Sequence, residues 1–194
     1  MENIIQNMAY AVAKWSVEDN DEDQIEIVTY GITLIIESIY KMIILIIIAF
    51  LTHKVYETLV VIGSFCGLRL LAGGIHCKTS FGCTLTMIFI WFSGIMSAHI
   101  YIPDLLIAIM LCLSLAVVFI YAPAATKNNP ITNPKIRTSK KAGAVIMICV
   151  QMLICLRAMN MDNLPLANMI SVPIFIEAVS VLLLRLVEGK PEKQ

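Results

Sequence analysis

Charged residues are scarce in this sequence, and its basic residues form no long run. Only 14% of the 194 residues are charged, whereas 59% are hydrophobic, and the mean hydropathy is +0.83. A soluble domain of this length could not bury so much apolar surface, so we expect the lipid bilayer to be its solvent. The formal net charge of +0 and the lack of a concentrated basic face also exclude a nucleic-acid partner.

A secretory signal peptide is also lacking. Residues 1–15 carry Glu2 early and have neither a short uninterrupted apolar core nor a small-residue cleavage site, so we expect this segment to remain on the mature protein. Within residues 1–24, apolar side chains recur at three- and four-residue spacing, which predicts an amphipathic helix. Its apolar stripe suits either the membrane interface or packing against other helices, and both interpretations stay open. The stripe consists of Ile4, Ile5, Met8, Ala11, Val12 and Trp15.

The six cysteines do not follow the pattern of a disulfide framework or a zinc site. Four of them lie within apolar runs, where cysteine usually acts as a small hydrophobic residue. His76, Cys77 and Cys83 provide at most three soft ligands without the paired spacing of structural zinc, so we expect no metal and no other cofactor. The four cysteines in apolar runs are Cys66, Cys112, Cys149 and Cys155.

Six apolar segments come near the length of about 20 residues that a membrane-spanning helix needs. The sequence therefore predicts an all-α, polytopic transmembrane bundle that forms a single integral membrane domain over residues 1–194, with a basic loop at residues 122–141. Four or five spans with re-entrant segments are the alternative. The expected spans are residues 32–51, 55–71, 80–100, 105–121, 142–159 and 166–186.

The basic residues predict the orientation of these spans, because Lys and Arg near spans are retained on the cytoplasmic side. Six spans place both termini on the same side. With the termini inside, eleven basic residues face the cytoplasm and two, Lys54 and Arg157, face outward, while Lys41 lies within a span. This orientation also places residues 69–80 on the cytoplasmic side. The eleven are Lys14, Arg69, Lys78, Lys127, Lys135, Arg137, Lys140, Lys141, Arg185, Lys190 and Lys193.

Glu37 and Lys41 stand four residues apart within the first span. With the acid nearer the N-terminus, this is the favourable order for a pair on the same face of a helix. A proton or substrate relay is the functional interpretation. We favour a structural pair inside the bundle, because the spans offer no second ionisable chain.

The strongest chemical signal lies in residues 69–83 (RLLAGGIHCKTSFGC), where an apolar run is interrupted. Gly73 and Gly74 permit a sharp bend, which predicts a re-entrant or interfacial turn at residues 72–80. An ordinary turn between helices would explain the glycines as well.

His76 and Cys83 form the candidate catalytic pair. On one continuous helix they would lie about 10 Å apart, which is too far for direct proton transfer. We therefore expect His76 outside the helix, with Thr79 or Ser80 capping a helix whose first turn contains Cys83. The helix dipole there favours a thiolate, and the imidazole can serve as acid and base. Cys77 is the rival nucleophile but lies outside the expected helix start.

These residues resemble the motif of the accessory gene regulator B (AgrB) family, membrane cysteine endopeptidases that process quorum-sensing propeptides. The motif is an arginine, a glycine pair, a histidine and a cysteine seven residues later. Length, hydropathy and the position of the site agree over essentially the whole chain, although Cys77 departs from the pattern. The matching residues are Arg69, Gly73, Gly74, His76 and Cys83, followed by Tyr121, Ala122, Pro123, Thr126, Lys127 and Pro130 in a proline-bearing loop.

The resemblance implies an AgrD-like propeptide as partner, with an amphipathic N-terminal segment, a ring-forming centre and an acidic tail. Cys83 would attack the carbonyl at the tail junction and His76 would protonate the departing amine, after which the acyl-enzyme thioester would cyclise to a thiolactone or lactone. A homodimer in the bacterial plasma membrane is also implied. The motif contains no Asp or Glu to orient His76, so a dyad, a backbone carbonyl or a distant residue stay open as its support.

Further residues are candidates for binding the substrate. Arg69 is expected to stabilise an oxyanion or bind a carboxylate, or only to anchor the topology. Lys135 and Arg137 are expected to attract the acidic tail, or again only to anchor the topology. The full set of these candidates is Arg69, Gly73, Gly74, Ser80, Lys135 and Arg137.

A small transporter or channel is the alternative function, with the glycine turn as a gate and the pair of Glu37 and Lys41 on the path. A membrane scaffold or sensor without activity is a third interpretation. Only the peptidase requires a reactive thiol at Cys83.

Overall fold

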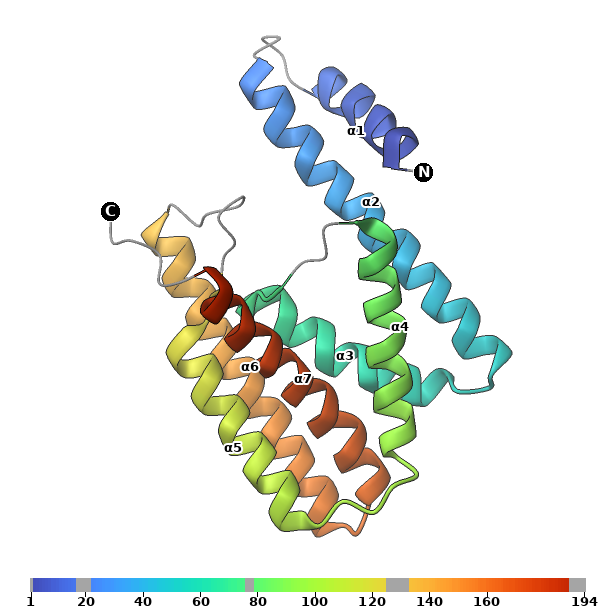
Figure 1. Ribbon diagram of the computed structural model, residues 1–194, viewed down its shortest axis with the longest axis vertical. Coiled ribbons are helices and arrows are strands. Elements are labelled where there is room, and N and C mark those ends of the chain that lie inside the picture. Colours follow the sequence, from blue (N-terminus) through green and yellow to red (C-terminus); the bar gives the residue numbers. More distant parts are fainter. Residues whose placement is uncertain (1, 17–21, 76–78, 125–132, 189–194) are drawn as a thin grey trace. The chain divides into compact units, whose positions relative to one another are not determined.

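A computed structural model describes residues 2–16, 22–75, 79–124 and 133–188 (Figure 1). Within these ranges the chain is all-helical, and its one β-type pairing is an isolated bridge between Gly73 and Ala124. The predicted fold class is therefore confirmed. The seven helices of the described residues are α1 (Glu2–Ser16), α2 (Glu22–Leu51), α3 (Val55–Ala72), α4 (Ser80–Ser97), α5 (Asp104–Tyr121), α6 (Pro134–Asn160) and α7 (Leu164–Glu188).

Six of these helices, α2 to α7, are long and apolar enough to cross a membrane. Each has at least 18 residues, and the chain is accordingly a multi-pass membrane protein. All six predicted spans correspond to helices, but two helices begin earlier than expected, α2 at Glu22 and α6 at Pro134. The start of α6 has a local cause, because the Asn133 side chain accepts a 3.0 Å hydrogen bond from Lys135 N and proline occupies the first turn. Residues 134–141 are thus helical rather than part of a loop.

The chain divides into two compact units. Residues 1–53 and 77–87 form the N-terminal unit, which contains α1, α2 and the first turns of α4. Residues 54–76 and 88–194 form the bundle unit, which contains α3, the rest of α4 and α5 to α7. The single membrane domain expected from the sequence stays a prediction.

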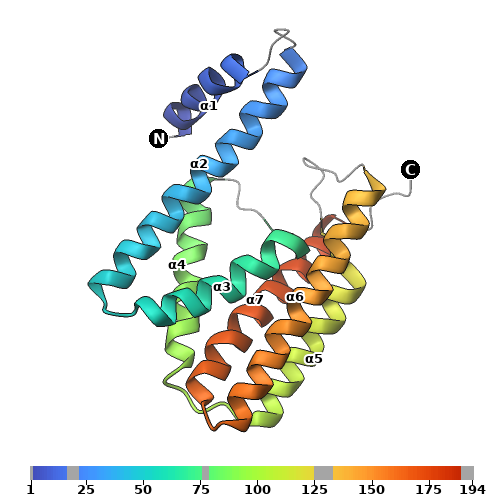
Figure 2. The same cartoon turned by 180° about the vertical axis from the view of Figure 1, so that it is seen from behind.

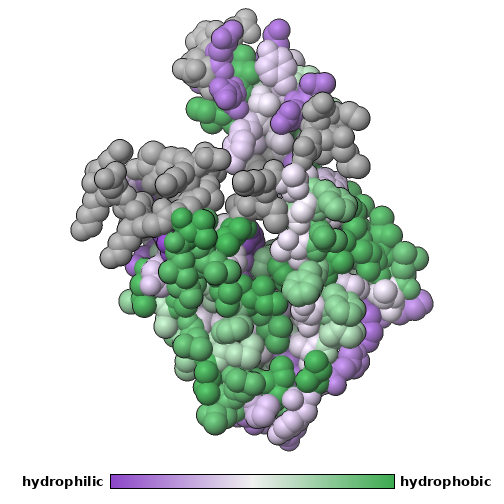
Figure 3. All heavy atoms as spheres, viewed as in Figure 1, coloured by the Kyte–Doolittle hydropathy of each residue, from purple (hydrophilic) through white to green (hydrophobic). Residues whose placement is uncertain are grey.

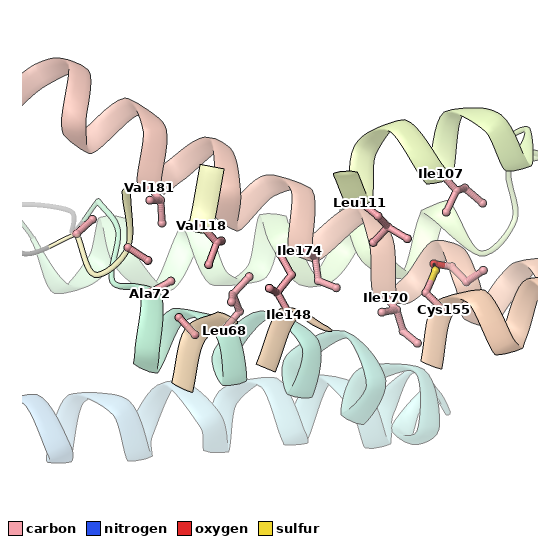
Figure 4. Close-up of a cluster of buried hydrophobic side chains, with 14 of the residues drawn as sticks. Leu68, Ala72, Ile107, Leu111, Val118, Ile148, Cys155, Ile170, Ile174 and Val181 are labelled. Atoms are coloured by element: carbon pink, nitrogen blue, oxygen red, sulfur yellow. Dashed lines mark hydrogen bonds between the residues drawn. The ribbon is translucent and has the colours of Figure 1, made fainter. Parts of the chain in front are cut away.

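In the bundle unit, α7 packs against α3, α5 and α6, as both ribbon views show (Figures 1 and 2). The core lies between these four helices and includes Leu68, Val118, Ile148, Ile174 and Val181 (Figure 4). These residues come from all four helices, so each helix contributes one apolar face to a shared interior.

Buried polar side chains link the helices of the bundle unit. Trp91 Nε1 donates to Thr58 Oγ1 at 2.8 Å, Gln151 Nε2 donates to Ser64 O at 2.8 Å, and Asn168 Nδ2 donates to Ser97 O at 2.9 Å. In a membrane, apolar contact between helices only replaces equally apolar contact with lipid, so it gives little hydrophobic stabilisation. Hydrogen bonds between helices therefore help to hold the bundle together. The face of the bundle unit that Figure 3 shows is largely hydrophobic. Exposed side chains of this unit include Leu113, Phe119 and Leu153.

The N-terminal unit pairs α1 with α2. Ala9 and Ala13 are the buried side of α1, with no exposed surface, whereas Met8, Val12 and Trp15 are exposed. The predicted amphipathic stripe is therefore not the face that is buried in this unit. An outward apolar stripe is what a helix needs in order to lie in the membrane interface.

Candidate active site

Cys83 lies in the first turns of α4, as the sequence predicts. The Thr79 side chain caps this helix, because its Oγ1 accepts a 3.1 Å hydrogen bond from Gly82 N. The Thr79 carbonyl accepts the first main-chain bond of the helix from Cys83 N, also at 3.1 Å. Cys83 is a free, half-buried thiol near the positive end of the helix dipole. His76, Cys77 and Lys78 lie outside the described residues, so the placement of His76 stays a prediction.

Two hydroxyl groups on either side of Cys83 are held by Tyr40 of α2. The Tyr40 hydroxyl lies 2.7 Å from Ser80 Oγ and 2.9 Å from Thr84 Oγ1. Ser80 and Thr84 flank Cys83 on the first two turns of α4, so this shared contact ties the helix that carries Cys83 to α2. Ser80, proposed from the sequence as a donor to substrate, therefore also has a partner in its own unit.

An ion pair on α2 lies beside the thiol. Lys41 Nζ is 3.0 Å from Glu37 Oε2, and Lys41 is only 7% exposed. The Lys41 ammonium also interacts electrostatically with Cys83. A cation next to a thiol stabilises the thiolate, which is the nucleophilic form. The sequence reveals the pair, but its structural interpretation rests on the premise that the spans offer no second ionisable chain. Glu177 of α7 contradicts that premise.

In the bundle unit, Arg69 is bound by its own chain. Its Nη1 lies 3.0 Å from Glu177 Oε2 and donates to Ser180 Oγ at 3.2 Å, and its Nη2 donates to Ile75 O. Ser180 Oγ also accepts from Ile75 N at 3.0 Å. Sequence reasoning missed Glu177 and Ser180. A glutamate within an apolar span was the signal that could have drawn attention to them.

Both glycines of the motif have conformations and surroundings that exclude a side chain. Gly73 has φ +74° and would place a Cβ against the main-chain carbonyl oxygen of Ala124. Gly74 has φ +144°, and a Cβ there would lie 2.7 Å from both Arg69 Nη1 and Ser180 Oγ. The glycines therefore allow the turn after α3 to approach its neighbours closely.

The start of the predicted proline-bearing loop lies against this turn. Ala124 N donates to Ala72 O at 2.7 Å, next to the bridge between Gly73 and Ala124. Arg185 of α7 donates through Nη2 to Tyr121 O at 3.2 Å and to Pro123 O at 2.7 Å. Two motif segments that are distant in sequence are thus brought together, whereas Thr126, Lys127 and Pro130 lie outside the described residues.

Lys135 and Arg137 are exposed at the N-terminal end of α6. Two turns further along this helix, Gly143 packs against Leu71 near the end of α3. Both cations therefore lie at the same end of the bundle unit as the glycine turn. Cations are unfavourable near the positive end of a helix dipole, and the first turn of α6 has no acidic residue to offset them. Helix stability therefore does not explain why Lys135 and Arg137 lie at the start of α6.

Comparison with known proteins agrees with the motif. The family described as Accessory gene regulator B matches residues 5–181. Accessory gene regulator protein B of Staphylococcus aureus (strain Newman) is 30% identical over 183 residues, covering 93% of this chain and 94% of that protein. A putative AgrB-like protein of Lactiplantibacillus plantarum is 34% identical over 123 residues, covering 62% of this chain and 61% of that protein. No solved structure matches. The chain therefore belongs to the accessory gene regulator B family.

Proposed function

We propose that this protein is a membrane cysteine endopeptidase that removes the C-terminal tail of an AgrD-like propeptide in quorum sensing. The observation that carries the proposal is the setting of Cys83, a half-buried thiol at the capped start of α4 beside the Lys41 ammonium. The start of a helix and a nearby cation are the surroundings in which reactive cysteines are found. The family membership supplies the propeptide as substrate class.

In the first step, the Cys83 thiol transfers its proton to His76 and the thiolate attacks the carbonyl carbon at the tail junction. The carbon–nitrogen bond breaks, and the departing tail amine takes the proton from His76. The products are a free acidic tail and a thioester between the remaining peptide and Cys83.

In the second step, the ring-forming cysteine or serine of the propeptide attacks this thioester. The attacking group gives its proton to His76, the bond between the carbonyl carbon and the Cys83 sulfur breaks, and Cys83 departs as a thiolate. The peptide thereby closes to a thiolactone or a lactone. Exchange between two thioesters is close to energy-neutral, whereas hydrolysis is downhill, so water must be kept from the acyl-enzyme. A half-buried nucleophile on an apolar helix is suited to this requirement.

The acidic tail is recognised by Lys135 and Arg137 in this proposal. Both are exposed, and both lie at the same end of the bundle unit as the glycine turn. Clustered cations raise the encounter rate with an anionic peptide and orient it. The biased count of basic residues predicts that this end, both termini and the site face the cytoplasm, and we expect the protein to act as a homodimer.

Mass spectrometry of the intact protein tests this function. Wild-type protein is incubated with a propeptide whose ring-forming residue is alanine, which blocks the second step and should leave the peptide attached to Cys83. Cys83→Ser should form no adduct, and His76→Ala should lower the rate of tail release about a hundredfold or more. Cys112→Ser, at an exposed thiol of α5, is the matched control and should behave as wild type.

A different result would contradict the proposal. An adduct on Cys77, or full cleavage by Cys83→Ser, would refute the assignment of the nucleophile. A transporter or channel would be indifferent to both substitutions.

A further inference from the structure

The turn before His76 is held by side chains from a distant helix. Arg69 near the end of α3 contacts Glu177 and Ser180 on α7, which lie 108 and 111 residues later. Arg69 and Ser180 each bind the backbone of Ile75, at its carbonyl and its amide respectively. Four interactions thus connect α3, α7 and the turn within the bundle unit.

Glu177 is an unusual residue at this place. It is fully buried in an apolar helix, where an ionisable group is costly unless it is paired. Its Oε2 binds Arg69, and its Oε1 has no hydrogen-bond partner among the residues that the structure describes. A Cβ on Gly74 would lie 3.0 Å from that second oxygen. The carboxylate therefore faces the glycine turn directly.

We propose that Arg69, Glu177 and Ser180 form a clamp that fixes the backbone of Gly73–Ile75, and thereby positions the catalytic histidine that follows. The three are positioning residues, since they act through the turn and not on the substrate. The inference rests on the proposed function, in which His76 is the acid and base. It also assigns a role to a glutamate that the motif does not include.

The residue types fit this role. An arginine presents a rigid fork of donors, so one side chain can bind a carboxylate, a hydroxyl and a carbonyl together. A serine oxygen has two lone pairs, and here it accepts from Arg69 Nη1 and Ile75 N. Ile75 belongs neither to α3 nor to a sheet, so its amide and carbonyl have no partner in a regular element and are bound by these side chains instead.

The start of the turn is also held by the chain after α5. Ala124 pairs with Gly73, and Ala124 N donates to Ala72 O. The turn is therefore bound by Ala124 at Ala72 and Gly73 and by the Arg69 and Ser180 side chains at Ile75. A backbone bound on both sides can place the next residue reproducibly, and proton transfer requires this, because a misplacement of about 1 Å costs up to roughly a hundredfold in rate.

Hydrogen exchange of the full chain in detergent micelles tests the clamp without reference to activity. The Ile75 amide should exchange at least about fivefold faster in Ser180→Ala and Glu177→Gln than in wild type, since loss of one hydrogen bond changes local opening by such a factor. Ser171→Ala is the control, because Ser171 is another serine of α7, fully buried, whose hydroxyl bonds within its own helix. Unchanged exchange in both clamp variants would overturn the inference.

Tail-release kinetics test the consequence for catalysis. Glu177→Gln and Ser180→Ala should lower kcat about tenfold to a hundredfold with KM little changed, because the histidine and not substrate binding is disturbed. Glu177→Asp should restore part of the rate, whereas Arg69→Lys should not, since one ammonium cannot replace the fork. If Glu177→Gln does not fold, Ser180→Ala keeps the ion pair and still decides the question.

The outcomes separate the two proposals. Absence of tail release by the wild type would refute the proposed function. Hydrogen exchange of the Ile75 amide would still test whether the clamp fixes the turn. Faster exchange of the Ile75 amide together with an unchanged kcat would overturn the positioning role.

Discussion

The Lys41 ammonium on α2 interacts electrostatically with the Cys83 thiol on α4. Lys41 Nζ also lies 3.0 Å from Glu37 Oε2, one helical turn earlier on α2, so this ion pair holds the ammonium in place. Burying a cation within a membrane-spanning helix is costly, so a buried lysine beside a thiol is a candidate for a functional arrangement.

Removal of this charge should make Cys83 less reactive. In a background that retains Cys83 alone among the cysteines, Lys41→Met should slow alkylation of Cys83 by iodoacetamide at neutral pH, because the cation beside the reacting sulfur is lost. Lys41→Arg should keep most of the rate. Lys54→Met, which breaks the comparable ion pair with Glu57 on α3, is the control and should leave the rate unchanged. Equal rates in Lys41→Met and wild type would show that the lysine does not activate the thiol.

Substitution of alanine at two glycines should have opposite effects on stability. Gly73→Ala should destabilise the bundle unit by about 1–2 kcal/mol or more, because φ is +74° and the Cβ meets the Ala124 carbonyl. Gly63→Ala should stabilise it by about 0.5–1 kcal/mol, since a Cβ there has open space within α3. Thermal unfolding in detergent measures both. A melting temperature for Gly73→Ala at or above that of wild type would contradict the geometry of the turn.

Neutralising the cations at the start of α6 should weaken substrate binding. The double variant Lys135→Gln with Arg137→Gln should raise KM for the propeptide several-fold, and the difference from wild type should shrink in high salt as screening increases. Arg157→Gln, at the other end of the same helix, is the control. Unchanged KM with correct topology would leave these cations only an anchoring role.

The two ends of α6 should face opposite sides of the membrane. With the native cysteines replaced, Thr138→Cys should resist an impermeant thiol reagent on intact cells, and Met161→Cys should be labelled. Both positions belong to exposed residues, so labelling reports the side and not burial. The reversed pattern would invert the topology that the basic residues predict.

The sequence alone was sufficient to predict the membrane class, the six spans and the start of the helix that carries Cys83. Each depends on local composition or on a few neighbouring residues, such as Thr79 three residues before Gly82. The start of α6 was placed too late, although Asn133 and Pro134 are a readable local signal for a helix N-terminus.

The partners of the motif residues were decided only by the tertiary structure. Arg69 is paired with Glu177, 108 residues away, and the thiol of Cys83 lies beside Lys41 of another helix. Helical periodicity tells which residues share a face of one helix. It does not tell which neighbouring helix packs against that face. In the membrane both faces of a span are apolar, so the rotation of each helix is set by packing and by buried polar contacts between distant residues.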